Sequence, residues 1–178
     1  MVIILADYYE RLVQEYLELH DFVVRLNVKF KKTMGPPSNI DVIAINSLKN
    51  KIIVGEVKGE RLGKKQIDKE NEDFNNINQR KRVQEVLGHT DYGKYVFCWG
   101  TNEETERYAK KEYQIHIVPF WKIINYLIDR IKELGQKDRY RYERGIEYPN
   151  LMLLQMLYHY SKPYKGKTRI DLNQLQKS

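Results

Sequence analysis

The sequence predicts an α/β fold: a mixed β-sheet of about five strands flanked by helices, followed by a helical C-terminal extension. Two observations predict it. Three strand-like segments follow an opening helix, and strands then alternate with helices up to residue 134. A meander followed by such alternation is typical of a mixed sheet with helices on both faces. We expect a core over residues 1–135 and a basic, tyrosine-rich extension over residues 136–178.

The first half of the core is expected to form one helix and three strands. Apolar residues at helical spacing predict a helix over residues 7–19. Strict alternation predicts a strand over residues 22–30, with its apolar side chains on one face. Two further strands are expected over residues 40–46 and 51–58. The short polar segment between them is typical of a hairpin turn.

The second half is expected to alternate helices and strands. Residues 64–87 predict a long polar helix closed by Gly88, and residues 94–99 a fourth, central strand. Thr101 and Glu104 have the spacing of a capping box, which begins the next helix. A fifth strand over residues 114–118 precedes an amphipathic helix over residues 120–134, which Gly135 is expected to stop.

Composition narrows the function classes. The formal net charge of +7 and the pI of about 9.3 favour a polyanionic partner such as nucleic acid, although a basic surface can also serve solubility alone. The single cysteine, Cys98, excludes an intrachain disulfide and a multi-thiolate zinc site, and its apolar neighbours predict a buried thiol. The opening apolar run is too short for a signal peptide or a membrane span, so we expect an intracellular protein without a membrane partner.

Three charged residues are expected to meet at one end of the sheet. Glu56 and Lys58 lie two apart on a strand and therefore share a face with apolar neighbours, where charges are costly unless they are compensated. Asp41 precedes them across the hairpin, which places it near the same end. Asp41 and Glu56 could bind Mg²⁺, with the carbonyl of Val57 as a third ligand, and Lys58 could polarise a water. The alternative is that Glu56 and Lys58 form an ordinary charge pair on a strand, without a catalytic role.

Asp41 followed by Glu56-Val57-Lys58 after a short hairpin resembles the PD-(D/E)xK nuclease superfamily, nearest to its archaeal Holliday junction resolvase and Mrr-like branch. The resemblance covers about two-thirds of the chain. It implies a restriction-endonuclease-like fold and a Mg²⁺-dependent DNA endonuclease, with Mn²⁺ as a substitute cation and duplex or branched DNA as partner. It also implies that an acidic residue of the opening helix completes the catalytic and metal site. Glu10 matches that position, and Glu15 is the less favoured candidate.

The sequence departs from the family pattern at two points. Ile40, rather than proline, precedes Asp41. A glutamine follows the lysine on a helix in several branches, and Gln66 and Gln79 are both candidates here. The rival expectation is a nucleic-acid-binding or assembly subunit that keeps the nuclease-like fold without turnover.

Nucleic-acid contacts are expected from a small set of residues on the predicted long helix and in the extension. These are Gln79, Arg80, Arg82, Arg139 and Arg141. We expect a solvated, ion-paired surface for the first half of that helix, where acidic and basic residues mix. The apolar segment over residues 151–158 is expected to cross the protein's own core or to form a homodimer interface. The histidines lack the spacing of a metal site and are expected to be structural.

Overall fold

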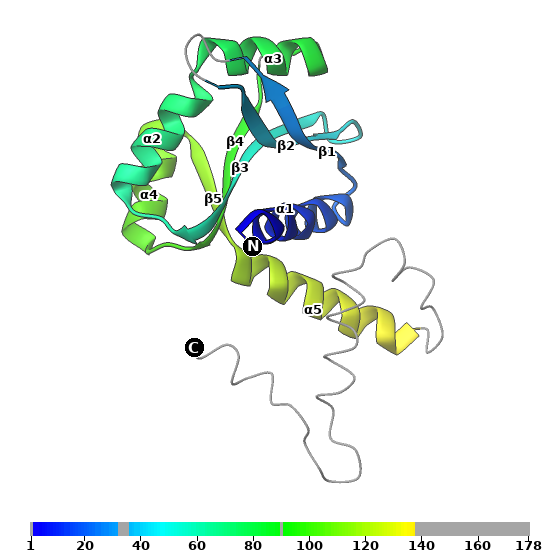
Figure 1. Cartoon of the computed structure of the whole chain (residues 1–178). Coiled ribbons are helices and arrows are strands. Elements are labelled where there is room, and N and C mark those ends of the chain that lie inside the picture. Colours follow the sequence, from blue (N-terminus) through cyan, green and yellow to red (C-terminus); the bar gives the residue numbers. More distant parts are fainter. Residues whose placement is uncertain (1, 32–35, 90, 138–178) are drawn as a thin grey trace. The chain divides into compact units, whose positions relative to one another are not determined.

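The computed structural model describes residues 2–31, 36–89 and 91–137 and shows an α/β protein with one mixed sheet (Figure 1). The five strands and five helices run in the order α1 (Val2–Glu18), β1 (Val23–Phe30), β2 (Ser38–Asn46), β3 (Lys51–Arg61), α2 (Lys64–Phe74), α3 (Ile77–Leu87), β4 (Gly93–Gly100), α4 (Glu103–Tyr113), β5 (Ile115–Pro119) and α5 (Phe120–Lys137). The expected fold class and five-stranded sheet are confirmed.

The strands lie in the sheet in their sequence order, β1-β2-β3-β4-β5. The first three form an antiparallel meander, and β3, β4 and β5 are parallel to one another. The parallel pairs need crossover connections, which α2–α3 and α4 provide. Because β3 belongs to both halves of the sheet, it is the central strand, not β4 as the sequence indicated.

Helices cover both faces of the sheet (Figure 1). Helix α1 contacts β1, β2 and β3 on one face. On the other, Ile67, Phe74, Val83 and Ala109 of α2, α3 and α4 are fully buried in one core cluster with strand residues that include Val54. Alternation along β3 therefore directs Val54, Glu56 and Lys58 toward α2, and Gly55, Val57 and Gly59 toward α1. An ideal Cβ on Gly59 would lie 3.2 Å from the ring of Tyr9 of α1.

Strand β1 reverses its pleat at Asn27. This residue has φ 54°, in the left-handed region, and the β1–β2 register has no pair between Leu26–Val42 and Val28–Ile40. Asn27 and Asp41 occupy the skipped positions. Val28 and Phe30 join the core cluster on the α2 side, whereas Val42, the partner of Leu26, is buried outside it. The expected single apolar face over residues 22–30 is therefore wrong, because one left-handed residue changes the face of those that follow.

Local polar residues explain where the other elements begin and end. The expected long helix is two helices, because Asn76 caps a new one: its Oδ1 accepts the backbone N–H groups of Asn78 (3.0 Å) and Gln79 (3.4 Å). The cap of α4 is Asn102, whose Oδ1 accepts the N–H of Thr105 at 2.8 Å, while Thr101 donates to the Leu62 carbonyl instead. Helix α5 continues through Gly135, and β3 continues past Lys58 after a register irregularity.

Two compact units divide the chain, Met1–Ile123 and Ile124–Ser178. The expected extension, the apolar segment over residues 151–158 and the contact candidates Arg139 and Arg141 lie outside the described residues. In the part of the chain that the structure describes, no helix is long and apolar enough to cross a membrane.

The cap at Asn76 can be tested by substitution. Asn76→Ala removes the acceptor for two otherwise unpaired N–H groups, so we expect the free energy of unfolding to fall by about 1 kcal/mol in a urea titration. Gln84→Ala, at an exposed position of the same helix, is the control and should change it by less than about 0.5 kcal/mol. Equal values for the two variants would contradict the assigned cap.

Candidate active site

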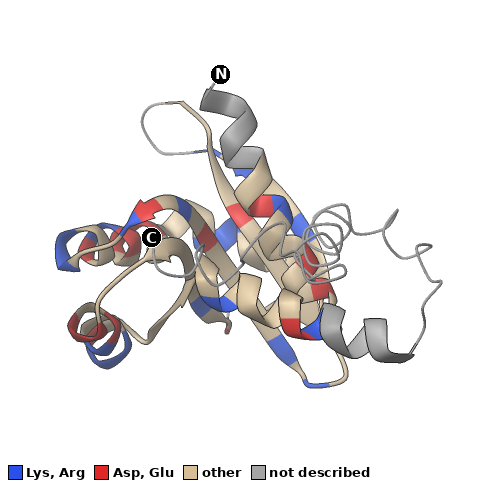
Figure 2. Ribbon diagram, turned by 90° about the horizontal axis from the view of Figure 1, so that it is seen from below, with Lys and Arg blue, Asp and Glu red and all other residues tan. Residues whose placement is uncertain are grey.

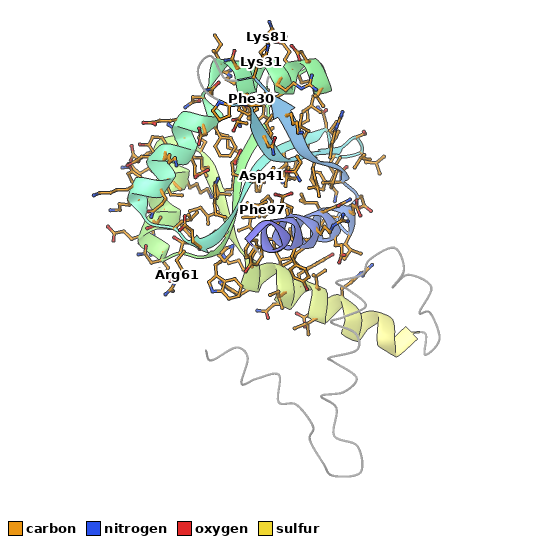
Figure 3. All side chains as sticks on the ribbon, in the orientation of Figure 1. Phe30, Lys31, Asp41, Arg61, Lys81 and Phe97 are labelled. Atoms are coloured by element: carbon orange, nitrogen blue, oxygen red, sulfur yellow. The ribbon has the colours of Figure 1, made fainter. Side chains whose placement is uncertain are left out.

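Asp41, Glu56 and Lys58 converge within the sheet, as the sequence predicted. The Asp41 Oδ2 accepts the backbone N–H of Val57 at 2.8 Å, which fixes the carboxylate beside the strand that carries the other two residues. Lys58 Nζ lies 3.3 Å from Glu56 Oε2. The label of Asp41 lies over the strands in Figure 3, and its side chain is half-buried. Three groups from two strands thus form one polar cluster.

The position of Asp41 follows from the irregularity in β1. Where the β1–β2 ladder skips Asn27 and Asp41, the Asp41 side chain can accept an N–H from β3. The flanking residues Ile40 and Val42 are both fully buried, so the backbone on either side is fixed by packing. With Oδ2 bound to Val57, the second oxygen of the carboxylate remains as a potential ligand.

A fourth charged residue, Glu70 of α2, completes the cluster. Its Oε2 lies 3.2 Å from Lys58 Nζ, so the ammonium group contacts carboxylates from both β3 and α2. Glu56 and Glu70 are 6% and 5% exposed, whereas the Lys58 side chain retains 26% exposure. The cluster is therefore buried on its acidic side and open to solvent at the lysine.

The electrostatics of the cluster favour a cation. Burial, followed by the charges of Asp41 and Glu70, raises the pKa of Glu56 to about 9, although Lys58 acts to lower it. Burial alone would lower the pKa of Lys58, but Glu56, Glu70 and Asp41 together raise it above its ordinary value. Burial likewise raises the pKa of Glu70. Three acids around one ammonium group leave a demand for positive charge, which a proton on Glu56 meets below about pH 9 and a bound cation could meet instead.

Glu70 was not expected at the site. We expected the first half of the predicted helix over residues 64–87, which corresponds to α2, to be solvated. For Glu70 that is wrong, because the residue faces the core. It lies three residues after Ile67 and four before Phe74, and both of these are fully buried. Positions three and four apart share a helix face. This spacing was a usable signal, but the acidic neighbours of Glu70 along the chain obscured it.

Glu10 of α1 is buried, with 8% exposure, and its carboxylate accepts a hydrogen bond from the Asn27 side chain. Asn27 occupies the β1 position opposite Asp41, so a single hydrogen bond connects Glu10 to the neighbour of the site. Glu15, the less favoured acid, is also buried on α1. The role of Glu10 in catalysis stays a prediction.

The residues predicted to contact nucleic acid differ in their exposure to solvent. Gln79 is only 1% exposed, and its buried Nε2 has no hydrogen-bond partner among the described residues. Its expected contact with nucleic acid is incompatible with this packing. Arg80 is exposed, and Arg82 pairs with Glu85 at 3.0 Å. The other candidate glutamine, Gln66, is exposed and accepts the N–H of Gly63 at 3.1 Å.

The charged surface mixes both signs where it can be described. Segments of Lys or Arg and of Asp or Glu alternate along α2 and α4 (Figure 2). Lys64 of α2 pairs with Glu104 of α4 at 2.6 Å. For the exposed residues of α2, this agrees with the ion-paired surface expected for the first half of the predicted helix over residues 64–87. Lys81 of α3 and Lys31, which follows β1, lie at one end of the protein (Figure 3), where α3 contacts β1.

The residues present fit a hard cation with few protein ligands. Among the described residues, no group of three or more His, Cys, Asp or Glu side chains is arranged to hold a metal ion. Mg²⁺ is nevertheless commonly held by one or two carboxylates, with water and substrate phosphate supplying the other ligands. Asp41 and Glu56 meet that requirement, and the carbonyl of Val57 stays the candidate third ligand.

Cys98 is buried, as expected, and burial raises the pKa of its thiol to about 11. The Sγ atom contacts the Gly100 carbonyl at 3.5 Å. A buried thiol with a raised pKa is a poor nucleophile, because only the thiolate attacks. Cys98 is therefore not a candidate nucleophile.

Comparisons with known proteins give little beyond this geometry. No protein-family model matches the chain, and no curated protein matches it. The chain is similar to the crystal structure of AF1548, a protein of unknown function, with a TM-score of 0.42 and 18% identity over 94% of this chain and 75% of that chain. A likeness at this level assigns neither a family nor an activity, so function is inferred from the site residues.

The buried state of Glu56 makes a prediction about stability without added cations. Its pKa is higher in the folded than in the unfolded protein, so folding favours the protonated form, and this contribution is lost as pH rises from about 4.5 through about 9. Glu56→Gln mimics the protonated group. At pH 8 we expect the variant to melt at a higher temperature than the wild type, which corresponds to a gain of at least about 1 kcal/mol in the free energy of unfolding. The difference should shrink toward pH 5.

The matched control is Glu60→Gln, which removes a carboxylate from an exposed position of the same strand. Its effect on the melting temperature should be small at every pH. A Glu56→Gln variant that is less stable than the wild type at pH 8 would show that Glu56 is ionised and well compensated in the folded protein.

Proposed function

We propose that the protein is a Mg²⁺-dependent DNA endonuclease in which Asp41 and Glu56 bind the cation and Lys58 assists the attacking water. The single observation that carries this proposal is the cluster itself: the carboxylate of Asp41 beside Val57, and the ammonium of Lys58 3.3 Å from a buried Glu56. Two carboxylates and one lysine from an antiparallel strand pair are the groups that resemble the PD-(D/E)xK superfamily. The strand meander that carries them supports that resemblance.

The chemistry of these side chains suits hydrolysis of a phosphodiester. When bound, the cation would polarise a phosphoryl oxygen and lower the pKa of a water. Asp41 is held by a backbone N–H, so it presents its free oxygen without rearrangement of the strand. Lys58, with its exposed fraction, reaches solvent and can donate to the water or to a phosphate oxygen on which negative charge develops.

DNA is the proposed substrate, with duplex or branched DNA as the form that the resemblance implies. The net charge of +7 supports a polyanionic partner. Arg80 and Lys81 on α3 are exposed and available to contact phosphate groups. Glu10 is proposed to complete the acidic side of the site through Asn27, and Mn²⁺ is the proposed substitute cation. A homodimer, which would allow both strands of a duplex to be cut, is part of the same proposal.

Cation binding is expected to stabilise the protein and to depend on pH. At a hundredfold excess over its dissociation constant, Mn²⁺ should raise the free energy of unfolding by about 2.7 kcal/mol. Binding displaces the proton that Glu56 holds below pH 9, so the affinity for Mn²⁺ should rise from pH 6 to pH 9, at most about tenfold per unit. Titration calorimetry in buffers of different ionisation enthalpy measures both the affinity and the released proton.

Asp41→Asn and Glu56→Gln should each abolish this stabilisation, and Glu60→Gln should retain it. Stabilisation of equal size in all four proteins would place the cation elsewhere.

Cleavage tests the activity directly. With Mg²⁺ or Mn²⁺, we expect the wild-type protein to cut linear, branched or single-stranded DNA, and chelation with EDTA to stop it. Asp41→Asn, Glu56→Gln and Lys58→Met should each lower the rate at least about a hundredfold, because each removes a charge that the transition state needs. Lys65→Met, at an exposed position of α2, is the control for lost positive charge.

Full activity in Asp41→Asn or Lys58→Met would overturn the proposed site. Binding of DNA by the wild-type protein without cleavage under any of these conditions would indicate a nucleic-acid-binding subunit with a nuclease-like fold.

A further inference from the structure

We propose that Glu70 is a positioning residue for Lys58, which holds the ammonium group in place when Glu56 is engaged by the cation. This inference rests on the proposed function and adds a residue from α2 to a site otherwise built on β2 and β3. It assigns no direct contact between Glu70 and substrate.

The geometry around Lys58 shows why a second carboxylate is needed. One ammonium group contacts Glu56 at 3.3 Å and Glu70 at 3.2 Å. In the proposed reaction Glu56 is also a cation ligand, and its charge cannot serve both partners fully. A lysine side chain has four rotatable carbon–carbon bonds, and it loses its preferred position if its only partner is drawn away. Glu70 remains a partner of Lys58 both when Glu56 is free of the cation and when Glu56 binds it.

Glu70 itself has little alternative to this contact. Its Oε2 is buried without a hydrogen-bond partner, so the ion pair with Lys58 is what compensates the oxygen among the described residues. The residue is anchored from both sides, since Ile67 and Phe74 fix the same face of α2 in the core. A carboxylate fixed within a packed helix face holds a flexible lysine better than an exposed carboxylate does.

A merely structural Glu70 would affect folding but not the chemical step, and the two roles differ in measurable ways. We expect Glu70→Gln to lower kcat about ten- to a hundredfold while leaving KM for DNA and the half-saturating concentration of Mn²⁺ unchanged. A lysine displaced by about 1 Å has consequences of that size. Glu70→Asp keeps the charge on a shorter side chain and should recover part of the loss. Glu72→Gln, at an exposed position of α2, is the matched control.

A melting cycle without DNA or cations tests the same pair independently of activity. In the wild-type background, Glu70→Gln should lower the melting temperature, because it removes the carboxylate that pairs with Lys58. In the Lys58→Met background it should raise the melting temperature, because it removes a buried carboxylate that has lost its counterion. A reversal of sign between the two backgrounds shows that the two groups depend on each other.

The outcomes separate this inference from the proposed function. Reduced kcat in Glu70→Gln together with the reversal in melting supports the positioning role. Full kcat in Glu70→Gln, in an active wild-type background, overturns the inference and leaves the nuclease standing. A changed half-saturating Mn²⁺ concentration overturns it too, since Glu70 would then act on the cation and not on Lys58. A wild-type protein that cleaves no DNA overturns the proposed function and this role with it.

Discussion

The ion pairs of Lys58 are the interaction on which the site depends. The ammonium group lies between two nearly buried carboxylates, Glu56 at 3.3 Å and Glu70 at 3.2 Å, in an interface between a sheet and a helix that is otherwise apolar. Without the lysine, two carboxylates would face each other at low exposure, and each would have to be protonated or solvated. With it, positive charge is still in deficit once Asp41 is counted. That deficit is the physical reason to expect a cation.

The second determinant is a single left-handed residue. Asn27 interrupts β1 opposite Asp41, and the ladder loses one residue pair there. Because of this interruption, the Asp41 side chain on β2 can turn away from β1 and accept the N–H of Val57 on β3. The same Asn27 donates to Glu10 of α1. One irregular position thus connects α1, β1, β2 and β3 around the acidic side of the cluster.

Sequence reasoning predicted what depends on periodicity and on residue chemistry. Alternation and helical spacing were sufficient for the five strands and for the mixed sheet. The charges at Glu56 and Lys58 stood out because they interrupt an apolar strand face, and the hairpin brought Asp41 to them. Features that depend on a single polar side chain were harder to predict from the sequence. The break at Asn76 and the cap at Asn102 each depend on which of several adjacent polar residues accepts an N–H, and the sequence does not determine that choice.

Glu70 and Gln79 show the limit more clearly. Both lie on helices rich in charge, where Glu70 was expected to be solvated and Gln79 to contact nucleic acid, yet both are buried. The spacing of Glu70 from Ile67 and Phe74 indicated its face, but only a packed structure brings that face to Lys58. The central claim is that Asp41 and Glu56 together hold a divalent cation. A crystal of the protein grown with Mn²⁺ and a short DNA duplex tests it most directly, through anomalous scattering at the manganese edge. We predict one peak bound by carboxylate oxygens of Asp41 and Glu56. A structure with DNA bound and no manganese between those two residues would contradict the claim.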